Sequence, residues 1–199
     1  MMKPHRMTLR VAVCLAVTVC ASSVLAAPML WNKHPDGPRW YEYIHLDGDQ
    51  NWYTCREYAI EQLGHDLATI TSSQENAFVT ALLNMQPEPV TAWLGGFQEP
   101  ADSAPAENWH WITGEPWVYT NWWPGEPNDA EAGNEDGLSI WGGQGSDRAG
   151  YWNDAKRDGY NPRNYGFVIE YIPEPASLAL LLTGSLGILS RRRQPRSFE

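Results

Sequence analysis

Oxygen-bearing side chains are concentrated in one short stretch of the sequence. The segment "PGEPNDAEAGNED", residues 124–136, holds five carboxylates and two carboxamides, and the later "WND", residues 152–154, adds one of each. Calcium prefers about six to eight oxygen ligands carried on a loop, whereas zinc prefers His and Cys. The composition of these two segments therefore predicts a Ca2+ site.

Five side chains are the candidate calcium ligands: Glu126, Asn128, Glu135, Asn153 and Asp154. Three of the five are anionic, which suits a divalent ion, and the backbone carbonyl of Asp154 is a candidate sixth ligand. A cis peptide bond before Pro127 would turn the side chains on either side toward one point, and cis bonds occur almost only before proline. The spacing does not match an EF-hand loop, which needs a Gly and a closing Glu that are missing here.

Helices and strands must position these ligands. The segment 51–64 has the apolar period of an amphipathic helix that ends at Gly64, and a second helix begins with a capping box, Ser72 and Glu75, and ends before Pro87. Aromatic and β-branched runs predict short strands at 39–46, 66–70, 91–97, 108–114, 137–141, 150–154 and 165–172. Eight tryptophans between residues 93 and 152 are expected to bury their indole rings and hold the long later loops in a fixed shape.

Both ends of the chain have the pattern of processing signals. Residues 1–26 have a basic start, an apolar run and a small-residue exit, which predicts a secretory signal peptide cleaved after Ala26. Residues 173–196 contain a Pro-Glu-Pro, an apolar run at 176–190 and an arginine cluster. The apolar run is short for a membrane span, so one interpretation is a short anchor that holds the protein in the membrane transiently.

The charge of the segment between the two signals limits its partners. Seven of the 14 Lys and Arg residues and two of the 24 Asp and Glu residues lie outside residues 27–172, which leaves 7 basic and 22 acidic side chains and a net charge of −15. Such an acidic domain argues against nucleic acid or an anionic membrane surface as partner and suits a cation or a neutral ligand.

Cys55 is the one cysteine of residues 27–172, so no disulfide can form within the domain. Its place in a helical apolar pattern favours a buried, inert thiol over a reactive or intermolecular one. No nucleophile–base pair, nucleophile elbow or zinc motif is present, and we therefore expect no enzyme activity.

Four motifs resemble those of the C-type lectin-like domain and occur in that family's order: "WLGG" at 93–96, "EPN" at 126–128, "WND" at 152–154 and "FVIEY" at 167–171. The resemblance covers residues 38–172. It implies an α+β fold of the C-type lectin-like kind, with two helices packed on short antiparallel sheets and a long calcium-binding loop region.

The resemblance also implies what the site binds. Glu126, Asn128, Glu135, Asn153 and Asp154 match the family's principal calcium site, which also binds carbohydrate through two adjacent sugar hydroxyls. In this family an E-P-N motif accompanies mannose-type ligands. Because two extra residues separate Asn128 from Glu135 relative to a common member, Glu131 is an alternative to Glu135.

Some positions depart from the family pattern. An auxiliary calcium site is partly matched by Asp129 and Asp136, because Gln98 stands where an acid is expected. The family's two disulfides have no counterpart: the matching positions are Ala59 or Ile60, Ile169, and neighbours of Gly137 and Arg157. The resemblance therefore implies that apolar packing replaces the cross-links.

Residues 173–196 resemble the PEP-CTERM sorting signal of Gram-negative bacteria. This implies processing by an exosortase and delivery to the cell surface or extracellular matrix. The function that follows is calcium-dependent binding of a mannose-type glycan or exopolysaccharide. The alternative is a C-type lectin-like module that binds no sugar and serves protein–protein contact or matrix structure. Trp122 and Trp123 are candidates for stacking on a sugar, although a core position is favoured for both.

Overall fold

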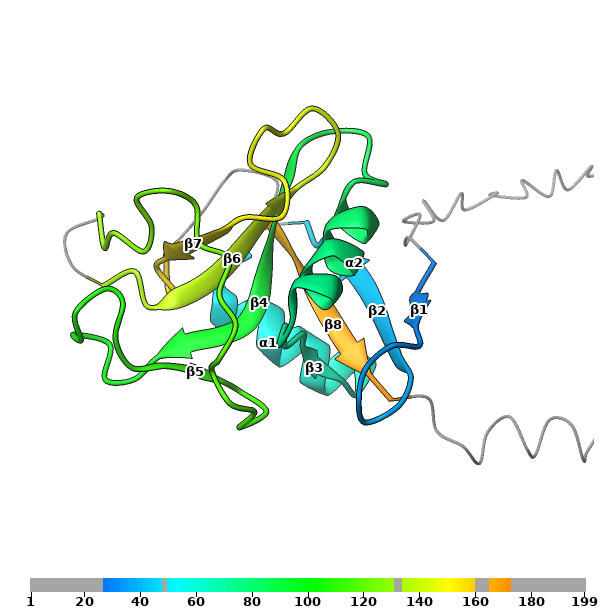
Figure 1. Ribbon diagram of the computed structural model, residues 1–199, viewed down its shortest axis with the longest axis horizontal. Coiled ribbons are helices and arrows are strands. Elements are labelled where there is room, and N and C mark those ends of the chain that lie inside the picture. Colours follow the sequence, from blue (N-terminus) through cyan, green and yellow to red (C-terminus); the bar gives the residue numbers. More distant parts are fainter. Residues whose placement is uncertain (1–26, 48–49, 131–133, 160–164, 173–199) are drawn as a thin grey trace, which may run out of the picture.

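The computed structural model describes residues 27–47, 50–130, 134–159 and 165–172 (Figure 1). Its elements, in chain order, are β1 Met29–Trp31, β2 Arg39–Ile44, α1 Trp52–Tyr58, the π-helical turn η1 Ala59–Leu63, β3 Asp66–Leu67, α2 Ser73–Leu83, β4 Val90–Gln98, β5 Trp109–Trp111, β6 Gly137–Gly142, β7 Trp152–Ala155 and β8 Tyr165–Tyr171. The order confirms the predicted α+β class, with two helices early in the chain.

The strands form one connected sheet in the order β1-β2-β8-β4-β6-β7, with β3 paired to β8 and β5 paired to β4. All these pairings are antiparallel except that of β4 with β8, which is parallel and puts Trp93 opposite Phe167. The predicted antiparallel arrangement is thus confirmed apart from one central pairing. Strand β1 was not predicted, and it extends the sheet beyond the expected start of the domain at residue 38.

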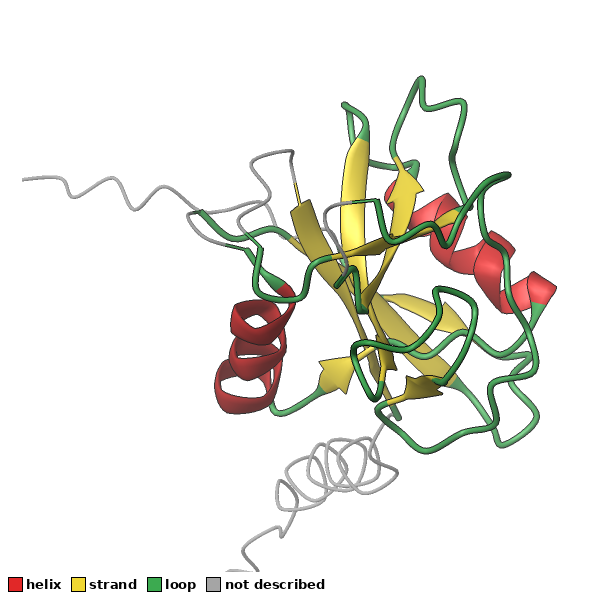
Figure 2. Ribbon diagram, turned by 90° about the vertical axis from the view of Figure 1, so that its left-hand side faces the viewer, coloured by secondary structure: helices red, strands yellow, loops and turns green. Residues whose placement is uncertain are grey.

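The two helices lie on opposite sides of the sheet (Figure 2). The alternation of side chains along the central strand β4 explains this arrangement, because neighbouring residues of a strand point to opposite faces. Ala92 and Leu94 pack in one apolar cluster with Val79 of α2, whereas Trp93 packs in the other with Cys55 of α1. Cys55 is completely buried, as predicted.

Both helices begin at side-chain caps. Asn51 accepts the backbone N–H of Thr54 at 2.9 Å, and Ser72 accepts that of Glu75 at 3.2 Å. The capping-box prediction for Glu75 is half right, because its carboxylate binds the N–H of Thr71, one residue before the cap, instead of reaching the N–H of Ser72. Glu75 also accepts the hydroxyl of Tyr41, and it therefore ties α2 to β2.

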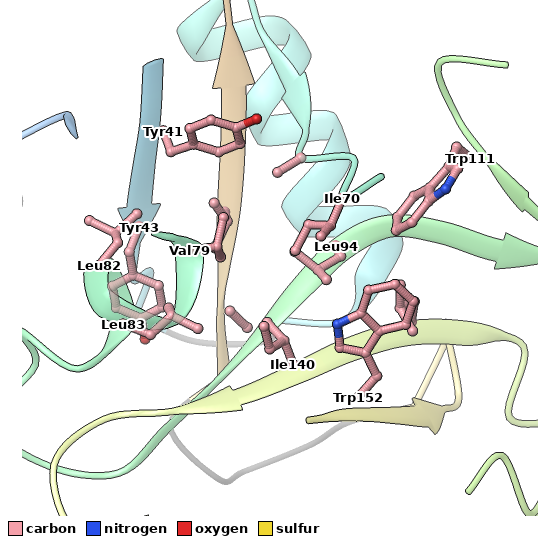
Figure 3. Packing of buried hydrophobic residues seen from close by; sticks show 14 of the residues in the cluster. Tyr41, Tyr43, Ile70, Val79, Leu82, Leu83, Leu94, Trp111, Ile140 and Trp152 are labelled. Carbon is pink, nitrogen blue, oxygen red and sulfur yellow. The ribbon is translucent and has the colours of Figure 1, made fainter. Parts of the chain in front are cut away.

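Buried aromatic and aliphatic side chains fill the space between α2 and the sheet (Figure 3). Trp111 and Trp152 lie at the side of this core nearest the long loop, where Trp117 packs against both at centroid distances of 4.5 and 5.8 Å. Trp122 completes the group, 5.0 Å from Trp109. The expectation that indoles hold the loop between β5 and β6 is confirmed, and Trp122 is partly buried against the core.

Other contacts are found at the positions where the resemblance implies cysteines. Ala59 and Ile169 are buried in the same apolar cluster. Near Gly137, Arg157 forms a buried ion pair with Asp136, and its guanidinium lies over the Tyr53 ring at 5.3 Å. Apolar packing is therefore found at one of these two places, and an ion pair flanked by rings is found at the other.

Candidate metal centre in the long loop

Strand β7 and the long loop meet at Asp154. Pairing of β7 with β6 sets Asp154 opposite Leu138, and the carboxylate points into the loop. Its Oδ2 accepts the backbone N–H groups of Asn128 and Asp129 at 3.0 and 2.8 Å. The Glu126–Pro127 peptide bond is cis, as predicted. The two oxygen-rich segments of the sequence are therefore one site in space.

Glu126 and Asp154 place two carboxylates against each other. Glu126 Oε2 and Asp154 Oδ1 are both buried, and no N–H or hydroxyl group of the described residues donates to either oxygen. Burial, followed by a hydrogen bond in which the two carboxyl groups share a proton and by the negative charge of Asp154, raises the pKa of Glu126 to about 7. A buried carboxylate without donors is costly, and a cation between the two groups would remove that cost.

Asn128 and Glu135 converge on one backbone group beside this pair. The N–H of Ala130 donates to Asn128 Oδ1 at 2.8 Å and to Glu135 Oε2 at 2.6 Å. The side-chain amide of Asn153 contacts the carbonyl of Asp154. A half-turn of that amide exchanges its nitrogen and oxygen, which would put two oxygens side by side there.

The carboxylates of Glu126, Glu135 and Asp154 do not all point to one position. Among the described residues, Glu126, Glu135 and Asp154 do not place one oxygen each within 4.8 Å of one another. Glu135 accepts the N–H of Ala130. Glu131, the alternative to Glu135, lies outside the described residues.

The residues of the predicted auxiliary site make other contacts. Asp129 Oδ1 accepts the N–H groups of Glu135, at 2.9 Å, and of Asn134, and these two bonds lower the pKa of Asp129. Asp136 Oδ2 accepts Arg157 Nε at 2.6 Å. Both acids therefore support the shape of the loop, and the auxiliary site stays a prediction.

The donor set fits a hard divalent cation. It consists of carboxylate and carboxamide oxygens with no His or Cys, which is the chemistry of calcium rather than zinc. The site also offers acceptors from its acids and donors from Asn128 and Asn153, the groups that a sugar hydroxyl can use. Glu126, Asn128, Glu135, Asn153 and Asp154 are the residues that would hold the ion.

One polar cluster was missed by sequence reasoning. His34, Glu75 and Glu170 each place one potential metal-binding atom within 4.8 Å of the others. Arg39 Nε donates to Glu170 at 3.1 Å, and Tyr41 donates to Glu75. These residues come from distant parts of the chain, so their spacing in the sequence does not indicate a metal site. Glu75 was also predicted to be part of the capping box of the second helix. Each carboxylate has protein partners, so the cluster is a buried network.

The part of the chain that the structure describes has no helix long and apolar enough to cross a membrane. The apolar run at 176–190 lies outside it.

Comparison with known proteins identifies two segments. The family model described as "Lectin C-type domain" matches residues 48–162, and the one described as "PEP-CTERM protein-sorting motif" matches residues 172–194. Ladderlectin of Oncorhynchus mykiss is 28% identical over 105 residues, which are 50% of this chain and 52% of ladderlectin. The matched part thus spans about half the length of that relative.

Two solved structures share the fold. The cow C-type carbohydrate-recognition domain of CD23, solved in the presence of GlcNAc2Man3 oligosaccharide, has a TM-score of 0.51 at 29% identity and covers 68% of this chain and 89% of that chain. A calcium-independent type II antifreeze protein has a TM-score of 0.51 at 20% identity and covers 75% of this chain and 97% of that chain. At that identity the second likeness shows the fold alone.

Proposed function

Because the chain belongs to the C-type lectin domain family, whose model matches residues 48–162, we propose that it binds carbohydrate in a calcium-dependent manner and prefers mannose-type sugars. Domains of this family are binding modules without enzyme activity, so the chain is not an enzyme. The PEP-CTERM motif at residues 172–194 marks it as an exported protein.

The observation that carries the proposal is the facing pair of carboxylates at Glu126 and Asp154. Their buried oxygens lack donors among the described residues, and the pKa of Glu126 is raised to about 7. Such an arrangement destabilises a protein unless a ligand uses it. A divalent cation is the ligand that best suits two anions flanked by carboxamides.

Sugar binding at this site would use the same side chains. Bound calcium would coordinate two adjacent sugar hydroxyls. Glu126 and Glu135 would accept the protons of those hydroxyls, while the amides of Asn128 and Asn153 would donate to their oxygens. The order acid then amide in "EPN" supports a preference for equatorial adjacent hydroxyls, as in mannose, fucose or glucosamine-like sugars.

The exported location supports an extracellular glycan as partner. We propose that residues 1–26 are the signal peptide, that residues 38–172 form the binding domain, and that an exosortase processes the signal at residues 173–196. Residues 176–190 would anchor the protein in the membrane transiently before it reaches the cell surface or extracellular matrix. The net charge of −15 over residues 27–172 disfavours nucleic acid.

A sugar-free role in protein contact is the alternative, and the fold shared with a calcium-independent antifreeze protein is the observation that favours it.

Calorimetric titration of calcium, followed by a glycan array with and without calcium, separates the two functions. The matched variant carries Glu126→Gln and Asn128→Asp, which reverses acid and amide while keeping Pro127. We expect calcium-dependent binding of mannose-type glycans by the wild type and a shift toward galactose-type glycans by the variant. No heat of calcium binding at millimolar concentration would favour the alternative.

A further inference from the structure

Four side chains form a surface cluster beside the metal centre: Trp123, Trp141, Arg148 and Tyr151, called here the arginine–aromatic cluster. The Trp123 ring meets Tyr151 edge to face at 5.0 Å and Trp141 at 6.4 Å. The Arg148 guanidinium lies over the rings of both tryptophans, 5.2 Å from Trp123 and 4.9 Å from Trp141. Tyr151 and Arg148 are exposed, so the cluster presents an aromatic surface with one cation to solvent.

Backbone contacts join the cluster to the candidate metal ligands. The N–H of Glu126 donates to the carbonyl of Trp123 at 2.8 Å, and Trp123 in turn donates to the carbonyl of Trp152 at 3.0 Å. The charge of Arg148 acts on the Glu126 carboxylate, which places the guanidinium near the metal centre. A sugar linked to one held at the metal centre would therefore lie near the cluster.

Arg148 forms no ion pair in the described part of the chain, although its positive charge acts on the Glu126 carboxylate and lowers the pKa of that group. The other three described arginines are paired: Arg39 with Glu170, Arg56 with Asp66 and Arg157 with Asp136. Arg148 instead lies across two indoles, an arrangement that holds its guanidinium plane in place and leaves its N–H groups available. An available arginine fork is suited to binding a carboxylate or another planar anion.

The loop that carries Arg148 has a defined shape. Its ends are joined by two backbone hydrogen bonds, from Trp141 to the Tyr151 carbonyl at 3.0 Å and from Gly150 to the Trp141 carbonyl at 2.8 Å. Gly143 has a φ of +86°, and a Cβ there would lie 2.2 Å from the Glu88 carbonyl oxygen. The cluster is therefore placed by the backbone rather than by the chance position of long side chains.

We propose that the arginine–aromatic cluster binds a carboxylate-bearing sugar residue next to the sugar held at the metal centre, so that the chain selects acidic glycans. The inference rests on the proposed function. Arg148 would pair with the sugar carboxylate, and the Tyr151 ring would contact the apolar side of the sugar ring.

The acidity of the domain opposes this binding at long range and also through Glu126, on which Arg148 acts, although a bound divalent cation would offset that nearby charge. Residues 27–172 carry a net charge of −15, but at physiological ionic strength charges separated by more than about 8 Å are largely screened. The contact with Arg148 acts within that distance. The selection of acidic glycans should therefore be local, and the overall affinity should stay modest.

Two matched trisaccharides test the proposal: β-1,4-linked mannotriose and the β-1,4-linked mannuronic acid trimer. They differ only in that each mannuronic acid residue has a carboxylate where mannose has a hydroxymethyl group. Calorimetry of the purified protein at saturating calcium would compare wild type with Arg148→Gln, Arg148→Lys and Lys33→Gln. Lys33→Gln makes the same change in net charge outside the cluster. The calcium affinity of each variant is measured first, because Arg148 acts on the ligand Glu126.

We expect wild type and Lys33→Gln to bind the acidic trimer about tenfold more tightly than the neutral one, as a charge-assisted contact would give. Arg148→Gln should bind both trimers with the affinity of wild type for mannotriose, and Arg148→Lys should fall between. Equal binding of both trimers by wild type, or an acidic preference that survives in Arg148→Gln, overturns the proposal while leaving the proposed function intact. Binding of neither trimer with calcium present overturns this inference, and the glycan array with and without calcium decides the proposed function separately.

Discussion

Asp154 accepts the backbone N–H of Asn128 at 3.0 Å, across 26 positions of the chain. This bond and the neighbouring one from Asp129 occupy Oδ2, while the buried Oδ1 lacks an N–H or hydroxyl donor among the described residues. The Asp154 side chain also interacts with Glu126. One oxygen of Asp154 thus holds the loop in shape, and the other is left for a ligand. The two uses can be separated by substitution.

Asp154→Asn should uncouple stability from calcium binding. The amide oxygen can still accept the N–H of Asn128, and the new NH2 group can donate to Glu126. We therefore expect the calcium-free variant to unfold with a free energy equal to that of wild type, or up to about 1 kcal/mol higher. Calcium affinity should fall about tenfold or more, because one anionic ligand is lost.

Urea unfolding with EDTA, and calcium titration of the same samples, would measure both quantities for Asp154→Asn. Asp154→Ala is the control, because it leaves the N–H groups of Asn128 and Asp129 without an acceptor and should cost about 1–3 kcal/mol. Wild-type calcium affinity in Asp154→Asn would contradict the role given to Oδ1.

Calcium affinity should rise with pH. The pKa of Glu126 is raised to about 7 in the calcium-free site, first by burial and then by Asp154. Below that pH Glu126 carries a proton that calcium must displace, so binding at pH 6 should be about tenfold weaker than well above pH 7. Titrations at pH 6, 7 and 8 in buffers of different ionisation enthalpy would report the released proton.

Glu126→Gln is the control for this pH dependence, because it cannot release a proton. We expect weaker binding that hardly changes between pH 6 and 8. An unchanged pH dependence in this variant would assign the proton to another group.

Much of the fold is readable from local sequence. Periodicity gave both helices, and aromatic runs located β4 to β8 within a few residues. The short strand β1 was not predicted, because three residues are too few to show alternation. It pairs with β2 and buries Trp31. The π-helical turn at Ala59–Leu63 has the same apolar residues as an α-helix, so periodicity cannot separate the two.

The candidate site is readable in its residue types but not in its finer geometry. A cis bond before Pro127 is permitted by residue chemistry, and the meeting of Glu126 with Asp154 is implied by the family resemblance. The hydrogen bond from Ala130 to Glu135 depends on the path of the loop, which sequence does not show. The contacts of Arg148 with two indoles depend on the path of a loop, which has no local signal.

The buried pair of Asp136 and Arg157 should be a large contributor to stability. Arg157 is 8% exposed, and its guanidinium lies 5.6 Å from the rings of Trp52 and Phe97. Arg157→Leu leaves a buried, unpaired Asp136 and should lower the free energy of unfolding by about 3–5 kcal/mol. Adding Asp136→Asn should recover part of that loss, because the residual charge disappears.

Denaturant unfolding of the single and double variants forms the cycle that measures this coupling. Arg56→Leu is the matched control, since the half-exposed pair with Asp66 should be worth about 1 kcal/mol or less. The same Asp136→Asn protein should bind as many calcium ions as wild type. Loss of one calcium-binding event would instead place Asp136 in the predicted auxiliary site.

Glu170 should make the protein less stable as pH rises toward neutrality. Burial raises the pKa of Glu170 from 4.5 to about 7, despite the N–H of Thr69 and the guanidinium of Arg39, which favour the charged form. Below pH 4.5 the Glu170 carboxyl is protonated in both the folded and the unfolded protein. Its contribution to the free energy of unfolding is then fully present. Between 4.5 and 7 the unfolded chain releases the proton while the folded protein keeps it, so stability is lost as pH rises through the folded pKa.

The expected loss between pH 5 and 8 is on the order of 2 kcal/mol. Urea unfolding with EDTA at unit steps of pH would compare wild type with Glu170→Gln, which cannot ionise but keeps an acceptor for Thr69. Glu126→Gln is a needed companion, because the pKa of Glu126 is raised into the same range. Glu170→Gln should flatten the profile by the amount assigned to this residue. Parallel profiles for wild type and Glu170→Gln would mean that the Arg39 ion pair keeps Glu170 charged throughout.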